Sequence, residues 1–111
     1  KAKEEYQTIN DQINAEYLKS VYVEGTNAYN SGDYNKAIED LQKVVDTDET
    51  YQDGDAVYFL AQSYRKAGNN EKAVIYYQKM VDAYPNTKRA ANSQNYLKEL
   101  GASVQEETAE Q

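Results

Sequence analysis

An internal repeat of 36 residues is the feature of this sequence that most constrains its fold. Shifting the chain by this distance aligns residues 21–46 with residues 57–82, and nine of the 26 aligned positions are identical. Chance would supply only about one or two identities in a segment of this composition. A segment that occurs twice in tandem is expected to form the same local structure twice, so we expect two similar units that stack on each other.

The apolar residues of each copy recur at the spacing of a helix. In the first copy, Ala37, Leu41 and Val44 are separated by four and three residues. Ala73 and Tyr77 begin the same pattern in the second copy. Residues at this spacing lie on one face of an α-helix, which is the face that packs against a neighbour.

Each copy also contains a break between two helical segments. Gly32 and Gly68 stand just beyond one segment, where a left-handed residue ends a helix, and Asp33 and Asn69 then supply a short polar side chain that can cap the next. Each unit is therefore predicted to be two helices joined by a tight turn. The predicted helices lie near 17–31, 34–47, 55–67 and 71–84, and a last helix, after Pro85 and a cap at Thr87, reaches about Leu100.

Two stretches of the chain, GTNAYNSGDYNKAIEDLQKVV and AQSYRKAGNNEKAVIYYQKMVDAYP, resemble tetratricopeptide repeats. The resemblance covers about residues 18–100. It implies an all-α fold, a right-handed stack of helical hairpins with two repeat units, an N-terminal helix and a C-terminal capping helix. The positions that carry it are Gly25 and Ala61, Gly32 and Gly68, Ala37 and Ala73, and Pro85.

A second, shorter stretch is similar to a bacterial sequence pattern. The string YPNTKRAANSQNYLKELG resembles one found in bacterial cell-envelope repeat proteins, such as the C-terminal domain of the Tol-Pal-associated coiled-coil protein. This implies a bacterial protein, and a scaffold role for the domain. Because the string also occurs in cytoplasmic repeats and the chain begins at Lys1 as if cut from a longer protein, the localisation stays open between cell envelope and cytoplasm.

Two repeat units leave apolar faces at both ends of the stack, so the flanking segments are expected to cover them. At the N-terminus, Tyr6, Ile9, Ile13 and Tyr17 form an apolar stripe on a predicted helix over 2–16. This helix caps the first unit, ends a longer coiled coil, or lies in the groove or exchanges between chains. At the other end, a capping helix is expected to bury one face, formed by Ala90, Ser93, Tyr96, Leu97 and Leu100.

These segments divide the chain into three parts. The last part has three Glu and a single large aliphatic residue, Val104, after position 101, which is too little apolar surface to offset the entropy of ordering. The predicted parts are an N-terminal helix over 1–16, a repeat domain with its capping helix over 17–100, and a disordered acidic tail over 101–111.

Composition excludes most familiar active sites. The chain contains no Cys and no His, which removes thiol chemistry, disulfides and zinc clusters. The acidic loop over 46–55 fails the spacing of a calcium-binding EF-hand, because Tyr51 stands where the glycine is required when Asp46 begins the loop. We therefore expect no metal, no cofactor and no enzyme activity, and the longest apolar run, 56–61, is too short to insert into a membrane.

The charge of the chain is distributed unevenly. The net charge is −7, which disfavours nucleic acid as a partner. Residues 33–55 contain eight acids and two bases, a net of −6, whereas residues 56–98 contain two acids and seven bases, a net of +5. These two regions are either solvated faces or complementary surfaces that bind a partner or a second copy of the chain.

The resemblance implies a concave groove lined by the first helix of each hairpin. Tyrosines there are either packing residues of the helix interfaces or contacts for a partner segment, while Arg65 and Lys66 would attract an acidic residue or a carboxylate. Asn95 and Glu99 extend the groove. The candidate groove residues are Tyr22, Thr26, Tyr29 and Asn30 in the first unit and Tyr58, Gln62, Arg65 and Lys66 in the second.

Two further expectations limit this site. Relatives that clamp a C-terminal carboxylate do so with a Lys and an Asn, and Tyr22 and Thr26 stand at those positions, so this mode is not expected. Tyr64, Tyr77 and Tyr84 lie where the family packs its core.

The sequence thus predicts a protein-protein interaction module that binds a peptide or helical segment in a tyrosine-lined groove, and the alternative is a self-assembly domain with no peptide ligand.

Overall fold

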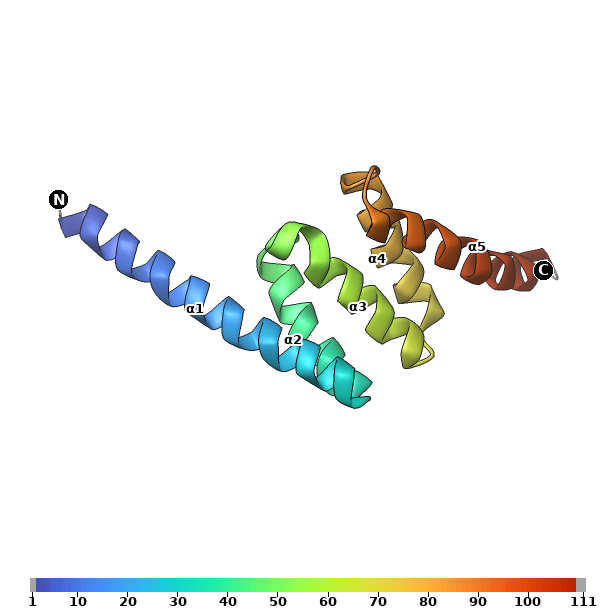
Figure 1. The fold of residues 1–111 in the computed structure, drawn as a ribbon, viewed down its shortest axis with the longest axis horizontal. Helices are drawn as coiled ribbons and strands as arrows, with labels where there is room; N and C mark the ends of the chain where they lie inside the picture. Colours follow the sequence, from blue (N-terminus) through green and yellow to red (C-terminus); the bar gives the residue numbers. More distant parts are fainter. Residues whose placement is uncertain (1, 110–111) are drawn as a thin grey trace.

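The fold is all-α, as the sequence predicted. The computed structural model describes the backbone of residues 2–109 and the side chains of residues 14–101. Over this range the elements are α1 (Ala2–Ser31), α2 (Tyr34–Thr47), a short 3-10 helix η1 (Tyr51–Gly54), α3 (Asp55–Lys66), α4 (Asn70–Ala83) and α5 (Lys88–Ala109) (Figure 1).

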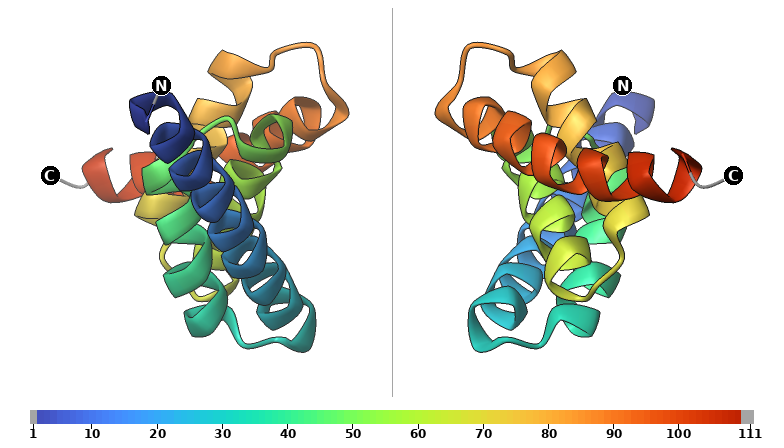
Figure 2. Two further views of the ribbon diagram at one scale, coloured as in Figure 1. Left: turned by 90° about the vertical axis from the view of Figure 1, so that its left-hand side faces the viewer. Right: turned by 90° about the vertical axis from the view of Figure 1, so that its right-hand side faces the viewer.

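Helical hairpins follow one another along the chain and stack. The helices α1 and α2 form the first hairpin, α3 and α4 form the second, and α5 packs on α4 (Figures 1 and 2). Contacts between α2 and α3 join the two hairpins. The molecule is elongated, with extents of 62 × 29 × 28 Å, because the stack grows in one direction and α1 continues beyond it.

The turns inside the two hairpins are built in the same way. Gly32 and Gly68 adopt φ values of 85° and 91°, a left-handed conformation that costs a side-chain-bearing residue free energy. In the residues that follow, Asp33 Oδ1 accepts a hydrogen bond from a backbone N–H at 3.2 Å, and Asn69 Oδ1 does the same at 3.2 Å. The predicted turn and cap are therefore confirmed in both units.

Close helix packing explains why small residues recur at the predicted positions. A Cβ atom on Gly25 would lie 2.9 Å from Leu41 Cγ, so α1 and α2 can approach only where this side chain is missing. Ala37, Ala61 and Ala73 are fully buried. The largest side chains of the core pack around these contacts, namely Tyr77, Leu41, Leu60, Met80 and Val44.

The last helix caps the stack as predicted. Thr87 Oγ1 accepts a hydrogen bond from the backbone N–H of Ala90 at 3.1 Å, which caps the first turn of α5. Ala90 and Ser93 are fully buried, and Leu100 is almost so, whereas Asn95, Lys98 and Glu99 on the other side are exposed. One face of α5 therefore covers α4 and the opposite face meets solvent.

The first helix differs from the prediction. The sequence predicted separate helices over 2–16 and 17–31, but α1 is continuous from Ala2 to Ser31. No Gly or Pro stands between residues 2 and 24, so nothing interrupts the helical hydrogen bonds. The first half of α1 extends away from the other helices (Figure 1), and Tyr17, where it leaves the stack, is 53% exposed.

The predicted stripe on this first half is only partly described. The side chains of Tyr6, Ile9 and Ile13 lie outside the described residues. What covers the stripe stays a prediction.

The end of the last helix also differs from the prediction. The sequence placed it near Leu100 and predicted a disordered tail over 101–111, whereas the described backbone of α5 is helical to Ala109. Gly101 lowers helix propensity but does not end the helix, because Ala, Gln and Glu, which favour helices, follow it and no Pro does. The side chains of 102–109 and all of 110–111 lie outside the described part.

Candidate binding face

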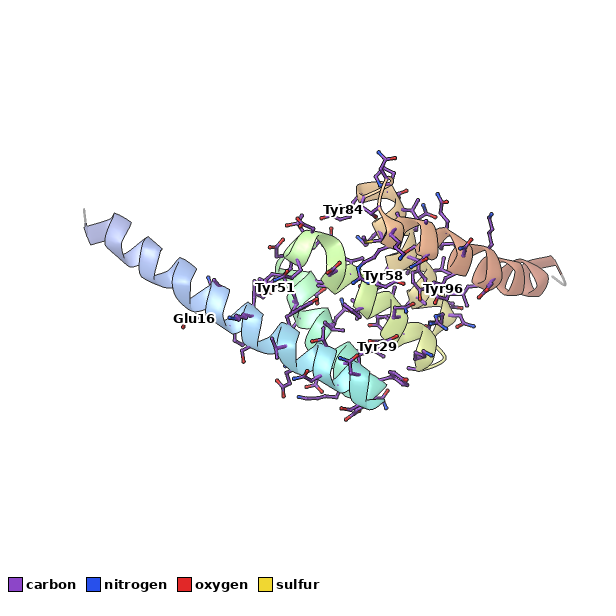
Figure 3. The ribbon with its side chains drawn as sticks, in the orientation of Figure 1. Glu16, Tyr29, Tyr51, Tyr58, Tyr84 and Tyr96 are labelled. Atoms are coloured by element: carbon purple, nitrogen blue, oxygen red, sulfur yellow. The ribbon has the colours of Figure 1, made fainter. Side chains whose placement is uncertain are left out.

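The first helices of the hairpins and the capping helix supply one connected set of half-buried side chains. We call it the α1–α3–α5 face. Ring and guanidinium contacts join α1 to α3 and α3 to α5, and Figure 3 labels three of the tyrosines involved, Tyr29, Tyr58 and Tyr96. The half-buried residues that define the face are Tyr22, Tyr29, Asp55, Phe59, Arg65, Arg89 and Tyr96.

Neutral aromatic contacts join α1 to α3. The ring of Tyr29 packs edge-on against Phe59 with centroids 5.6 Å apart, and Gln62 Nε2 donates a hydrogen bond to the Tyr29 hydroxyl at 3.4 Å. Nearer the start of the repeat, Tyr22 lies 5.2 Å from Tyr51 of η1, centroid to centroid. This half of the face therefore offers half-exposed rings and hydroxyl groups.

The two tyrosines that α1 contributes to the face, Tyr22 and Tyr29, keep their protons at neutral pH. Burial raises the pKa of Tyr22 above its ordinary value, and the negative charge of Asp55 raises it further while Arg89 opposes the shift. Burial likewise raises the pKa of Tyr29, against the opposing effect of Arg65. Both hydroxyl groups are therefore neutral hydrogen-bonding groups.

Two arginine side chains lie over tyrosine rings where α3 meets α5. The Arg65 guanidinium carbon of α3 lies 4.3 Å from the ring centroid of Tyr96 on α5. In return, the Arg89 guanidinium carbon of α5 lies 4.8 Å from the ring centroid of Tyr58 on α3. Tyr58 and Arg65 are seven residues apart on α3, and Arg89 and Tyr96 are seven residues apart on α5, which is about 10 Å or two helical turns. The same arginine–tyrosine contact is therefore made twice along two helices that run in the same direction.

Arg89 has a carboxylate partner. Its Nε atom lies 2.8 Å from Asp55 Oδ1, and both side chains are about one-third exposed. The guanidinium also lies 5.1 Å from the ring centroid of Phe59, the ring that Tyr29 also contacts. Arg89 of α5 therefore contacts several side chains of α3, and the carboxylate of Asp55 compensates its positive charge.

Arg65 has only neutral partners. Its Nε donates a hydrogen bond to the Tyr77 hydroxyl at 3.0 Å, and an Nη atom donates to Gln62 Oε1 at 3.4 Å. The Tyr77 hydroxyl donates to the same Gln62 oxygen. Among residues 14–101, no Asp or Glu forms an ion pair with Arg65.

A buried tyrosine fixes the position of this guanidinium. Tyr77 is fully buried, and its ring stacks on that of Tyr96 at 5.0 Å, centroid to centroid. Burial raises the pKa of Tyr77 well above its ordinary value, although the hydrogen bond from Arg65 opposes this shift. Burial lowers the pKa of Arg65, but the hydrogen bond with Tyr77 and the electrostatic effects of Tyr77, Tyr96 and Tyr29 together raise it above its ordinary value, so the guanidinium stays charged.

The eight predicted groove residues fall into three groups. Asn30 and Lys66 are exposed, and Tyr22, Thr26, Tyr29 and Arg65 are half-buried. Tyr58 is only 5% exposed and Gln62 only 9%, so these two support the face from beneath. The Thr26 hydroxyl donates to the Val23 carbonyl of its own helix at 3.1 Å.

The other expectations for this region can be located too. Asn95 and Glu99 are exposed on α5. Tyr64 and Tyr77, predicted as core residues, are buried, and Tyr84 is half-buried against Gly54.

Four residues of the face escaped the sequence prediction. Asp55, Phe59, Arg89 and Tyr96 were not among the candidates, although Phe59 contacts side chains of both α1 and α5. One sequence signal points to Arg89 and Tyr96. Arg89 and Tyr96 have the same seven-residue spacing as Tyr58 and Arg65, with the two residue types exchanged.

The described residues carry neither a metal site nor a membrane span. No group of three or more Asp or Glu side chains converges on a point within the part of the chain whose side chains are described. Of the helices between residues 2 and 109, none has the length and apolar character that crossing a bilayer requires.

Comparison with known proteins identifies one family. The model of the tetratricopeptide repeat family matches residues 22–87, which is more than half of the chain. The match includes both hairpin turns and the first five residues of the α1–α3–α5 face, but not Arg89 and Tyr96. No significant match was found among curated proteins or among solved structures.

Proposed function

The chain belongs to the tetratricopeptide repeat family, and from that premise we propose that it binds a segment of a partner protein on the α1–α3–α5 face. Domains of this family are generally protein-protein interaction modules and are typically not catalytic. Aromatic rings, hydroxyl groups and two guanidinium groups are gathered on this face. Such groups are enriched at the sites that dominate binding energy between proteins.

The observation that carries this proposal is the half-exposure of rings on three alternate helices, α1, α3 and α5. Tyr29, Phe59 and Tyr96 are held by contacts with their neighbours yet remain accessible, so a partner gains contact area without first having to order them. Arg65 adds a positive charge at the same end as the exposed Asn30 and Lys66. This combination suits an extended or helical segment that lies across the three helices.

The resemblance of residues 84–101 to bacterial cell-envelope repeat proteins makes an envelope assembly the first setting in which to search for the partner.

The experiment takes advantage of a chain without cysteine. A random-peptide library displayed on phage is selected against the immobilised protein, and the affinity of an enriched peptide is measured by fluorescence anisotropy. A bulky maleimide is then attached to Asn30→Cys or Asn95→Cys, exposed positions that adjoin Tyr29 and Tyr96 in the sequence, and to Ile75→Cys, which is 51% exposed on α4.

Labels on Asn30→Cys and Asn95→Cys are expected to abolish peptide binding, because they occupy the space of the ligand. The label on Ile75→Cys is the matched control and is expected to leave binding unchanged. Failure to enrich any peptide, or a block by the α4 label alone, would contradict the proposal.

Self-association is the second candidate function, and the course of α1 favours it. The first half of this helix extends beyond the stack (Figure 1), and Tyr17 at its base is 53% exposed. In this candidate function, the apolar stripe over residues 6–17 pairs with the same stripe of a second copy. Attraction between residues 33–55, with a net charge of −6, and residues 56–98, with a net charge of +5, adds to the association.

Sedimentation equilibrium tests this second candidate. The intact chain is expected to dimerise, and deletion of residues 1–13 or the change Tyr17→Glu is expected to leave monomers, while Ile75→Glu serves as a control on α4. Raised salt is expected to weaken any contribution from the charged regions. An intact chain that stays monomeric at every concentration would exclude this candidate.

A further inference from the structure

Two guanidinium sites lie about 10 Å apart on the α1–α3–α5 face, and they differ in one respect. Each places an arginine over a tyrosine of the neighbouring helix. At one site the carboxylate of Asp55 forms an ion pair with Arg89, and at the other the side-chain oxygen of Gln62 accepts a hydrogen bond from Arg65. Asp55 and Gln62 are themselves seven residues apart on α3, so they occupy equivalent places two turns apart.

A neutral amide therefore stands beside Arg65 where a carboxylate stands beside Arg89. The Gln62 oxygen satisfies one N–H of the guanidinium but leaves its positive charge uncompensated. The surrounding region adds to this charge, because residues 56–98 carry a net of +5 and Lys66 is the next residue along the chain.

The Arg65 guanidinium is also held ready for an anion. Two of its five N–H groups donate to Tyr77 and Gln62, and Tyr96 covers one flat side. The three remaining N–H groups form no hydrogen bond with residues 14–101. Since the side chain is already ordered, a carboxylate that reaches this edge gains charge-assisted hydrogen bonds at little entropic cost.

We propose that the partner segment presents an Asp or Glu side chain to Arg65, and that Gln62 sets this requirement by being neutral where the neighbouring site has Asp55. This inference rests on the proposed function and names the chemical class of its ligand, an acidic peptide. Arg89 makes no such demand, because Asp55 already neutralises it. Gln62 itself acts through Arg65 and is a positioning and specificity residue rather than a contact.

The test compares pairs of peptides on variants of the intact chain. The probes are peptides enriched from the random library, each made also with its acidic residue replaced by the amide, Glu by Gln or Asp by Asn. Binding of both members of a pair is measured by fluorescence anisotropy on the wild type, on Gln62→Glu and on Gln94→Glu. The last variant makes the same substitution and the same change of charge at an exposed position of α5.

On the wild type, the acidic peptide is expected to bind at least about tenfold more tightly than its amide counterpart. Gln62→Glu is expected to bring the affinities of the two peptides within about twofold of each other, because the new carboxylate neutralises Arg65 as Asp55 neutralises Arg89. Gln94→Glu is expected to keep the wild-type preference. Circular dichroism checks that each variant is folded, and Arg65→Gln, which removes the charge itself, gives the same loss of preference if Gln62→Glu is unstable.

The outcomes separate this inference from the function on which it rests. Enriched peptides that lack an acidic residue, or a preference that survives in both Gln62→Glu and Arg65→Gln, would overturn the inference and leave peptide binding intact. A library that yields no binder at all would overturn both.

Discussion

The two junctions on the α1–α3–α5 face are built differently although they join corresponding helices. Where α1 meets α3, Tyr29 contacts Phe59 and Gln62, and every group is neutral. Where α3 meets α5, two arginines lie over tyrosine rings, and only one of them has a carboxylate partner.

The repeat shows where this difference arises. Tyr29 and Arg65 are equivalent positions, 36 residues apart, and so are Tyr22 and Tyr58. The caps and the small residues at helix contacts are kept between the two units, while the residue that faces the next helix changes from aromatic to cationic. Backbone geometry and surface chemistry therefore vary independently in this stack, which lets a regular fold carry an asymmetric face.

The largest expected effect comes from removing the ring that supports the second junction. Tyr77→Ala leaves a cavity beneath Tyr96 and releases Arg65, and it is expected to lower the free energy of unfolding by about 3–5 kcal/mol. Urea denaturation followed by circular dichroism measures this. Ile75→Ala, an exposed aliphatic change on the same helix, is the control and should stay within about 0.5 kcal/mol of the wild type.

The corresponding change in the first junction should cost less. Tyr29 is half-buried and holds no charged group, so Tyr29→Ala is expected to lower the free energy of unfolding by about 1–2 kcal/mol in the same assay. A loss equal to that of Tyr77→Ala would show that the two junctions are equivalent in stability after all.

Removing one hydroxyl isolates the polar part of the second junction. Tyr77→Phe keeps the ring and deprives Arg65 and Gln62 of a shared partner, so a loss of about 1 kcal/mol is expected. Unchanged stability would mean that solvent replaces the hydroxyl without cost.

Alkaline pH should act on the same group. The folded-state pKa of Tyr77 is raised above the unfolded value of about 10. The folded state therefore holds this proton more tightly, so its contribution is complete below pH 10 and is lost as pH rises through the folded-state value. Melting temperatures measured across this alkaline range should fall more steeply for the wild type than for Tyr77→Phe, and parallel curves would contradict this.

The smallest effect is expected at the compensated arginine. Asp55→Asn removes the carboxylate partner of Arg89, but both side chains are partly exposed, so about 0.5 kcal/mol is expected. This difference should shrink further in high salt, which screens the pair in the wild type. A difference that is large or independent of salt would show that the pair is more strongly coupled than its exposure implies.

The sequence correctly predicted which helices contribute the half-buried residues of this face. Tyr22, Tyr29 and Arg65 were predicted on the face and are half-buried there. The burial of Gln62 was missed, and Tyr58 is a packing residue, which was one of the two alternatives left open, because helical spacing assigns a residue to one side of its own helix but does not say how far the next helix covers it. Whether these residues bind a partner stays a prediction.

Local interactions made the fold readable from the sequence alone. Turns at Gly32 and Gly68, caps at Asp33, Asn69 and Thr87, and the close approach at Gly25 each depend on residues near in sequence or on a repeated pattern, so they determined helix boundaries to within about one residue inside the repeats. The two outer ends were not determined in this way, because no neighbouring element and no breaker sets where α1 begins to leave the stack or where α5 ends.

Tertiary structure alone decided the chemistry of the face. The sequence contains Arg65, Tyr77 and Tyr96 on three different helices, and nothing in their spacing states that they meet. The register between α3 and α5 brings them together, and it also sets an amide beside one arginine and a carboxylate beside the other. Such contacts depend on how whole helices pack, because the residues that surround each of these side chains are distant from it along the chain.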